Sequence, residues 1–141
     1  MRLWHQKLIP YLPRQQLLGQ HRECCALRGK GWGKKHATVD YVFKYDPTYL
    51  VAYHYLVMEE MRRRNYNPNP VWKIADWRGD ELGDCEGWTN FVWATELCLE
   101  SKKGLIIYPE HNDEYLKECI DNLRDKGVDV SEMEKLLNGN N

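Results

Sequence analysis

The spacing of apolar residues in the first third of the chain predicts a helix over residues 13–28. Pro13 suits a first helical turn, and Gly29 suits the position just after a helix. At 100° per residue, one side of this helix carries Leu17, His21, Cys24 and Arg28. The opposite side carries a polar and small-residue stripe, Gln15, Gly19, Arg22 and Ala26. This stripe would let another backbone come close.

A second helix is predicted over residues 47–64. Asp46 is a good N-cap, Pro47 a good first helical residue, and Arg62–Arg64 complement the negative end of the helix dipole. Its apolar face consists of Leu50, Tyr53, His54, Val57 and Met61. Residues 38–45 are ambiguous between a strand and a short helix.

The rest of the chain continues the helical pattern after a surface loop rich in Asn, Pro, Gly and Asp at 65–87. The expected elements are a helix at 89–103, an extended stretch at 105–108, a helix at 113–126 and a short helix with a capping-box signature from Ser131. We therefore expect a mainly α fold, with at most minor strand content, in one domain spanning residues 1–141.

Composition excludes some classes of protein. No run of 18 apolar residues exists among the 141, so we expect no membrane span. The five cysteines are odd in number and form no C-x-x-C pair, which favours reduced thiols in a cytoplasmic protein over a disulfide framework or a zinc site. We expect no metal and no cofactor.

Charge is distributed unevenly although the net charge is only −1. Residues 1–64 carry twelve Lys/Arg against five Asp/Glu, and residues 65–141 carry eight against sixteen. A basic half attracts phosphates, but the two halves could equally neutralise each other by packing. A basic turn at 29–36 contains Lys34 and Lys35. It lacks the glycine and Ser/Thr positions of a P-loop.

Residues 12–23 read L-P-R-Q-Q-L-L-G-Q-H-R-E, with Gln15, Leu17, Arg22 and Glu23 at distinctive positions. This segment resembles the pyrimidine-dimer DNA glycosylase family, which has a similar L-x-x-Q-x-L-x-x-x-[HY]-R-E helix near its N-terminus. Two further stretches agree with the family, K-K-H at 34–36 and F-K…P-T-Y-L at 43–50. The similarity is good over residues 1–56 and poor over 65–110, where the chain carries extra material.

The resemblance implies a compact helical fold and an N-glycosylase coupled to an abasic-site lyase. It implies that the nucleophile is the α-amine of the chain, so the expected catalytic residues are Met1, Arg2 and Glu23. Arg2 is a poor context for removal of Met1, which places the amine on Met1. The expected DNA-binding residues are Gln15, Arg22, Arg28, Lys34 and Lys35. The expected partner is double-stranded DNA with damaged or abasic sites, bound by a monomer.

The sequence also departs from the family pattern. Gln16 stands where the family has His, Ala26 stands where it has Arg, and the aromatic, basic C-terminal tail is absent. Two alternatives therefore stay open. One is a non-catalytic nucleic-acid-binding module that uses the same basic face, and the other is a nuclease or RNA-modifying enzyme on this scaffold.

Overall fold

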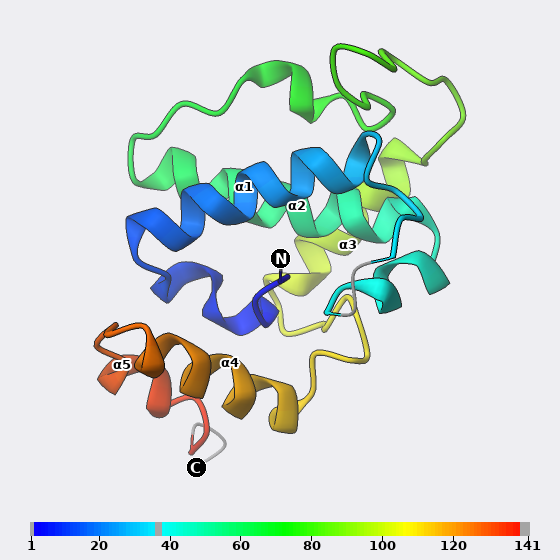
Figure 1. Ribbon diagram of the computed structural model, residues 1–141. Coiled ribbons are helices and arrows are strands. Elements are labelled where there is room, and N and C mark those ends of the chain that lie inside the picture. The colour runs from blue at the N-terminus through cyan, green and yellow to red at the C-terminus, as the bar shows by residue number, and fades with distance from the viewer. Residues whose placement is uncertain (1, 36–37, 139–141) are drawn as a thin grey trace.

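The computed structural model describes residues 2–35 and 38–138, and this part of the chain is mainly helical (Figure 1). Its α-helices are α1 (Arg14–Arg28), α2 (Pro47–Arg63), α3 (Phe91–Ser101), α4 (Asp113–Asp125) and α5 (Ser131–Glu134). Three 3-10 helices join them: η1 (Gln6–Tyr11), η2 (Asp40–Lys44) and η3 (Pro70–Lys73). Between described residues, the β-type pairing is one isolated bridge from Trp77 to Asp84. The predicted mainly α fold class is confirmed.

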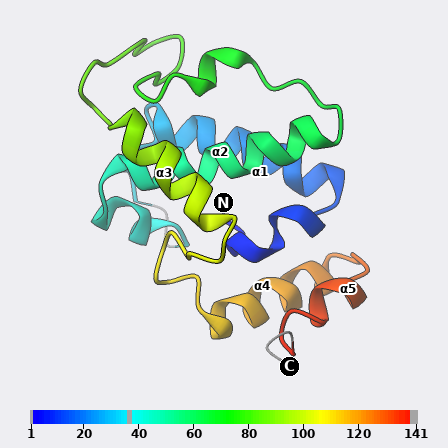
Figure 2. The same cartoon turned by 180° about the vertical axis from the view of Figure 1, so that it is seen from behind.

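Helix α2 is the centre of the molecule. It lies between α1 on one side and α3 on the other, as the two opposite views show (Figures 1 and 2). Because it has neighbours on both sides, α2 is buried over much of its circumference, and Leu50, Val51, Tyr53 and Val57 are fully shielded from solvent. The predicted apolar face was therefore only part of its buried surface.

The N-terminal segment and α4 form the lower layer in Figure 1. Leu3 and Leu8 from the chain start join the same core cluster as Leu116 and Ile120 of α4. The predicted apolar face of α4 is confirmed, since Leu116, Cys119, Ile120 and Leu123 are all buried. Within the described residues, no helix is long and apolar enough to cross a membrane.

Helix ends follow their capping residues. Asp46 accepts a hydrogen bond from the Thr48 amide at 2.9 Å, and the Gly29 amide closes α1 by donating to Cys25 and Ala26 carbonyls. Asn90 caps α3 through the Trp93 amide, so this helix begins later than the predicted residue 89. The capping box predicted at Ser131 is wrong. Ser131 is the first residue of α5, and its amide and hydroxyl both donate to Asp129.

Two short stretches, one predicted as ambiguous and one as extended, take their structure from their neighbours. Residues 40–44 form the 3-10 helix η2, which buries Val42 fully and exposes Lys44. The stretch at 105–108, predicted as extended, has no β partner among the described residues and runs as irregular chain toward α4. Its backbone is anchored instead by Gln6, which donates to the Leu105 carbonyl at 2.7 Å and accepts from the Ile107 amide at 2.9 Å.

Candidate functional site

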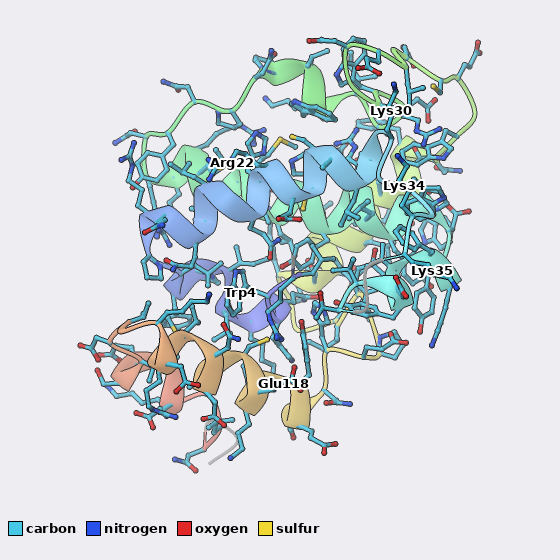
Figure 3. All side chains as sticks on the ribbon, viewed as in Figure 1. Trp4, Arg22, Lys30, Lys34, Lys35 and Glu118 are labelled. Atoms are coloured by element: carbon cyan, nitrogen blue, oxygen red, sulfur yellow. The ribbon has the colours of Figure 1, made fainter. Side chains whose placement is uncertain are left out.

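A polar cleft of about 440 Å³ opens between the chain start, α1 and the end of α4. One wall is the Gln15–Glu23 stretch of α1, and Asn122 and Lys126 face it from the C-terminal half. Figure 3 shows Trp4 and Arg22 on this same side of the molecule, with Glu118 of α4 below them. The residues that line the cleft are Arg2, Trp4, Gln15, Gln16, Gly19, Gln20, Arg22, Glu23, Thr38, Asn122 and Lys126.

The α1 wall of the cleft includes most of the predicted polar and small-residue stripe. Gln15 and Arg22 are exposed, and the missing side chain of Gly19 leaves room beside the Arg22 guanidinium. Arg22 makes no ion pair with any described residue, so its charge is available to an anionic ligand. Glu23 is half-buried on the same wall, and its Oε2 atom is shielded from solvent. The structure thus brings Gln15, Arg22 and Glu23 together at one cleft.

The backbone of the chain start runs along α1 close to this carboxylate. The side-chain amide of Gln20, one helical turn before Glu23, donates to the Arg2 carbonyl at 2.9 Å and accepts from the Trp4 amide at 2.6 Å. Gln20 itself is only 1% exposed. The sequence analysis did not select Gln20, although it falls on the buried stripe of α1 with Leu17, Cys24 and Leu27. A glutamine at a core position of a helix was the signal.

The two other predicted catalytic residues are Met1 and Arg2. Met1 lies outside the described residues. The Arg2 side chain turns toward α4, where Nη1 donates to Glu118 Oε2 at 2.9 Å and the guanidinium lies over the rings of Trp4 and Tyr115. Arg2 therefore ties the chain start to α4, and its guanidinium is occupied by that contact.

Lys34 and Lys35 lie on the turn after α1 and are exposed. Figure 3 places Lys30, Lys34 and Lys35 along one edge of the molecule, beside the C-terminal end of α1 and away from Trp4. Lys30 pairs with Glu81, whereas Lys34 and Lys35 form no ion pair with a described residue. Sequence reasoning missed a further cation, Lys126, which is exposed and lines the cleft from the end of α4.

The prediction that Arg28 binds DNA is corrected by its burial. Arg28 is 0% exposed, and its guanidinium donates to the backbone carbonyls of Trp72, Ile74, Ala75 and Trp77 at 2.8–3.2 Å. Burial lowers its pKa to about 10, so it stays cationic at neutral pH. Arg28 anchors the loop at 72–77 onto α1, and it presents no charge at the surface.

Arg63 and Arg64 also hold the fold together. Both pair with Glu60, and Arg64 further donates to the Leu12 carbonyl at 2.7 Å and the Pro10 carbonyl at 3.1 Å. Burial tends to raise the pKa of Glu60, but the hydrogen bonds from the two arginines outweigh it and hold that pKa below its ordinary value. Arg64 therefore ties the end of α2 to the chain before α1, in addition to complementing the helix dipole.

A cluster of His21, Cys25 and His54 brings three metal-ligand side chains within 4.8 Å of one another. The His21 Nδ1 and His54 Nε2 atoms are 2.8 Å apart, and Arg28 Nη1 lies 3.0 Å from His54 Nδ1. Because a guanidinium only donates, His54 Nδ1 must accept, and its hydrogen is then on Nε2, which donates to His21. That arrangement is a hydrogen-bonded chain ending at a buried cation, so His54 offers no lone pair toward the cluster centre.

A second hollow, of about 610 Å³, lies between η1, α2 and the end of α3. Its carboxylates are engaged, because Glu59 pairs with Lys102 and Glu60 with Arg63 and Arg64. Its lining is otherwise mostly apolar, including Ile9, Leu56 and Ile106. The cleft beside Glu23 is smaller but offers that carboxylate, three exposed amide or cationic side chains and the backbone of residues 2–4 alongside.

These features define a helical protein with a polar, cation-bearing cleft, a surface suited to a ligand with a phosphate backbone. Residues 1–74, more than half of the 141, match the family model of pyrimidine dimer DNA glycosylase. The chain therefore belongs to the pyrimidine dimer DNA glycosylase family. No curated protein and no solved structure matches it.

Family membership gives the chain a DNA glycosylase type of function in DNA repair, with DNA as the substrate. The matched region contains α1, the basic turn and α2. The opposite wall of the cleft, Asn122 and Lys126, comes from outside it. The site is thus assembled from a family half and a second half that the family model does not match.

Proposed function

We propose that this protein removes pyrimidine dimers from double-stranded DNA and then cleaves the abasic strand, using the α-amine of the chain as nucleophile and Glu23 as its acid–base partner. One observation carries the proposal. Gln20 holds the backbone of residues 2–4 against α1, one turn from Glu23 at the cleft. The family match supplies the substrate class.

An α-amine suits this chemistry because its pKa of about 7.7–8.0 leaves a useful neutral fraction at physiological pH, whereas a lysine has a pKa of about 10.4. The neutral amine attacks C1′ of the damaged nucleoside. The C1′–N bond breaks, and its electron pair leaves with the base. The C1′–O4′ bond then opens, O4′ takes up a proton, and the nitrogen, having lost one of its two protons, becomes a protonated imine, while the released base anion takes a proton from solvent.

Glu23 acts at two points in this scheme. As a carboxylate it stabilises the positive charge that develops on the sugar as the base leaves. It then removes a proton from C2′, which the imine has acidified, and β-elimination expels the 3′ phosphate. Hydrolysis of the imine returns the free amine. Arg22, Gln15, Lys34 and Lys35 hold backbone phosphates, and we add Lys126 from the opposite wall.

Borohydride reduction tests the imine directly. The protein is mixed with a duplex carrying an abasic site, or with ultraviolet-irradiated duplex, and reduced. We expect a covalent protein–DNA product that mass spectrometry maps to the N-terminal residue. Undamaged duplex is the control. Binding without a covalent product indicates the non-catalytic module, and strand cleavage without trapping indicates a nuclease.

The variant Glu23→Gln separates binding from chemistry. It keeps the shape of the side chain but cannot accept a proton, so we expect duplex affinity within about twofold of wild type and strand cleavage reduced at least about 100-fold, a typical size for loss of acid–base catalysis. Gln15→Glu, on the same wall, is the matched control for charge and is expected to weaken affinity instead. Full cleavage by Glu23→Gln would contradict the assignment.

A further inference from the structure

We infer that Gln20, Tyr53 and Tyr115 form a carbonyl clamp that fixes the position of the N-terminal segment along its own axis, and that Tyr115 is thereby a positioning residue for the α-amine. This inference rests on the proposed function, because only an amine nucleophile makes that position matter for catalysis. It assigns a role to α4, which lies outside the family match.

The clamp holds three consecutive backbone carbonyls. The Gln20 amide donates to Arg2 O at 2.9 Å, the Tyr115 hydroxyl donates to Leu3 O at 2.6 Å, and the Tyr53 hydroxyl lies 2.6 Å from Trp4 O. The three donors come from α1, α4 and α2 respectively. The amide orientation of Gln20 is fixed, because Trp4 N–H needs its oxygen and Arg2 O needs its nitrogen.

Side-chain burial locks the same position. Leu3 is fully buried, and Trp4 and His5 are 7% and 1% exposed. Sliding the segment by one residue would put a different side chain into each of these sites and break all three carbonyl contacts. The segment therefore has one favourable placement, and its first described residue, Arg2, is held at a fixed point.

The hydroxyls of the two tyrosines are protonated at neutral pH and can therefore donate. Burial raises the pKa of Tyr53 and of Tyr115 above the ordinary value. Because a phenolate cannot donate, a protonated hydroxyl is what the clamp needs. The Arg2 guanidinium, held by Glu118 and lying over the Tyr115 ring, ties the same segment to α4 a second time.

Position matters because covalent attack needs the reacting atoms about 3–3.5 Å apart and aligned, and a misplacement of about 1 Å can cost about 100-fold in rate. One added residue lengthens an extended chain by about 3.3–3.6 Å. A nucleophile on a chain end has no side-chain rotamer to fix its place, so it depends on whatever holds the backbone behind it.

The decisive comparison is Tyr115→Phe against Tyr55→Phe. Each removes one hydroxyl that donates to a backbone carbonyl at 2.6 Å from a half-buried ring, but Tyr55 bonds Lys73 O, which is not part of the clamp. We expect Tyr115→Phe to slow single-turnover imine trapping on abasic duplex by at least about tenfold, with duplex affinity unchanged. Tyr55→Phe should trap at the wild-type rate. Equal trapping rates per folded molecule in both variants would overturn the inference.

Insertion of one leucine between Met1 and Arg2 tests the same point without touching the core, because a large second residue keeps Met1 in place and the chain is one residue longer. The clamp contacts are kept, but the amine is moved outward, and we expect the trapping rate to fall at least as far as in Tyr115→Phe. Replacement of Met1 by alanine is the control, since it changes the side chain and keeps the length. Undiminished trapping by the insertion variant would show that the position of the segment has no catalytic role.

A readout independent of turnover separates this inference from the proposed function. The α-amine is methylated with formaldehyde and cyanoborohydride across a pH series, and mass spectrometry follows its modification. An amine held near a carboxylate has a raised pKa, so Glu23→Gln and Tyr115→Phe should both shift the profile to lower pH, and Tyr55→Phe should not. If wild type fails to trap DNA but shows these shifts, the lyase proposal fails and the clamp stands. If neither variant shifts the profile, the clamp is wrong.

Discussion

Two arginines six residues apart on α1 show how burial decides the role of a residue. Arg22 is exposed at the cleft, whereas Arg28 is fully buried among backbone carbonyls. Arg28→Met removes the guanidinium and leaves the carbonyls and the His54 ring that it contacts without a hydrogen-bond donor. Each unsatisfied buried group costs about 1–3 kcal/mol, so we expect the free energy of unfolding to fall by at least about 3 kcal/mol in urea titrations.

The matched variant is Arg22→Met, which we expect to change the free energy of unfolding by less than about 0.5 kcal/mol because the site is exposed. Its affinity for duplex DNA should fall, and the fall should shrink as salt is added. Fluorescence anisotropy with a labelled duplex measures the affinity and its dependence on salt. A stable Arg28→Met protein with weakened DNA binding would reverse the two assignments.

At the scale of elements, local capping chemistry made α1, α2 and α4 predictable. Asp46 with Pro47, and Gly29 after α1, act through contacts a few residues apart, and the structure has them where the sequence placed them. Residues 40–44 were ambiguous because a short segment is decided by what packs on it, here the fully buried Val42. Ser131 resembled a cap, but Asp129 two residues earlier takes its hydrogen bonds.

The residues of the candidate site also divide into those that local spacing predicts and those that depend on tertiary packing. Gln15, Arg22 and Glu23 could be grouped from one helix because their spacing alone puts them on neighbouring positions of its surface. Asn122 and Lys126 could not, since they reach the cleft only through the tertiary packing of α4 under the chain start. The misassignment of Arg28 has the same origin, because its partners lie 44–49 residues away.

We also predict that the basic turn after α1 contributes to the salt dependence of DNA binding. Lys34 and Lys35 are exposed without ion pairs to described residues, so each is expected to contact one phosphate. Lys34→Ala and Lys35→Ala should each reduce the slope of log affinity against log salt by about 0.9. Lys103→Ala is the control, because Lys103 lies beyond α3 and faces Glu100. Unchanged salt slopes in both lysine variants would remove the turn from the interface.

On the scale of the whole molecule, the opposite charges of the two halves are partly paired with each other. Ion pairs join the halves at Arg2–Glu118, Lys30–Glu81 and Lys44–Glu110. Arg22, Lys34 and Lys35 are exposed and outside these pairs. Packing therefore neutralises part of the basic half and leaves a smaller set of cations on the side that holds the cleft and its adjoining edge (Figure 3).

Buried histidines make the stability of the whole molecule depend on pH. Burial lowers the pKa of His5 to about 4 and that of His111 to about 3, and it also lowers the pKa of His21 and His54. In the unfolded chain these side chains titrate near pH 6.5. Between pH 6.5 and 4 the unfolded state therefore binds more protons than the native state, and stability falls as the pH falls.

We expect the free energy of unfolding to be flat above about pH 7 and to drop below pH 6.5, with each of His5 and His111 contributing up to about 1.4 kcal/mol per pH unit. The lowered pKa values of Glu59, Glu60 and Asp76 add to the loss only below about pH 4.5, so the window from pH 6.5 to 5 isolates the histidines. Urea titrations at half-unit steps measure the slope, and histidine C2 proton shifts follow each ring. A stability maximum at pH 5, or native His111 protonated at pH 6, would show that these rings are not held neutral by the core.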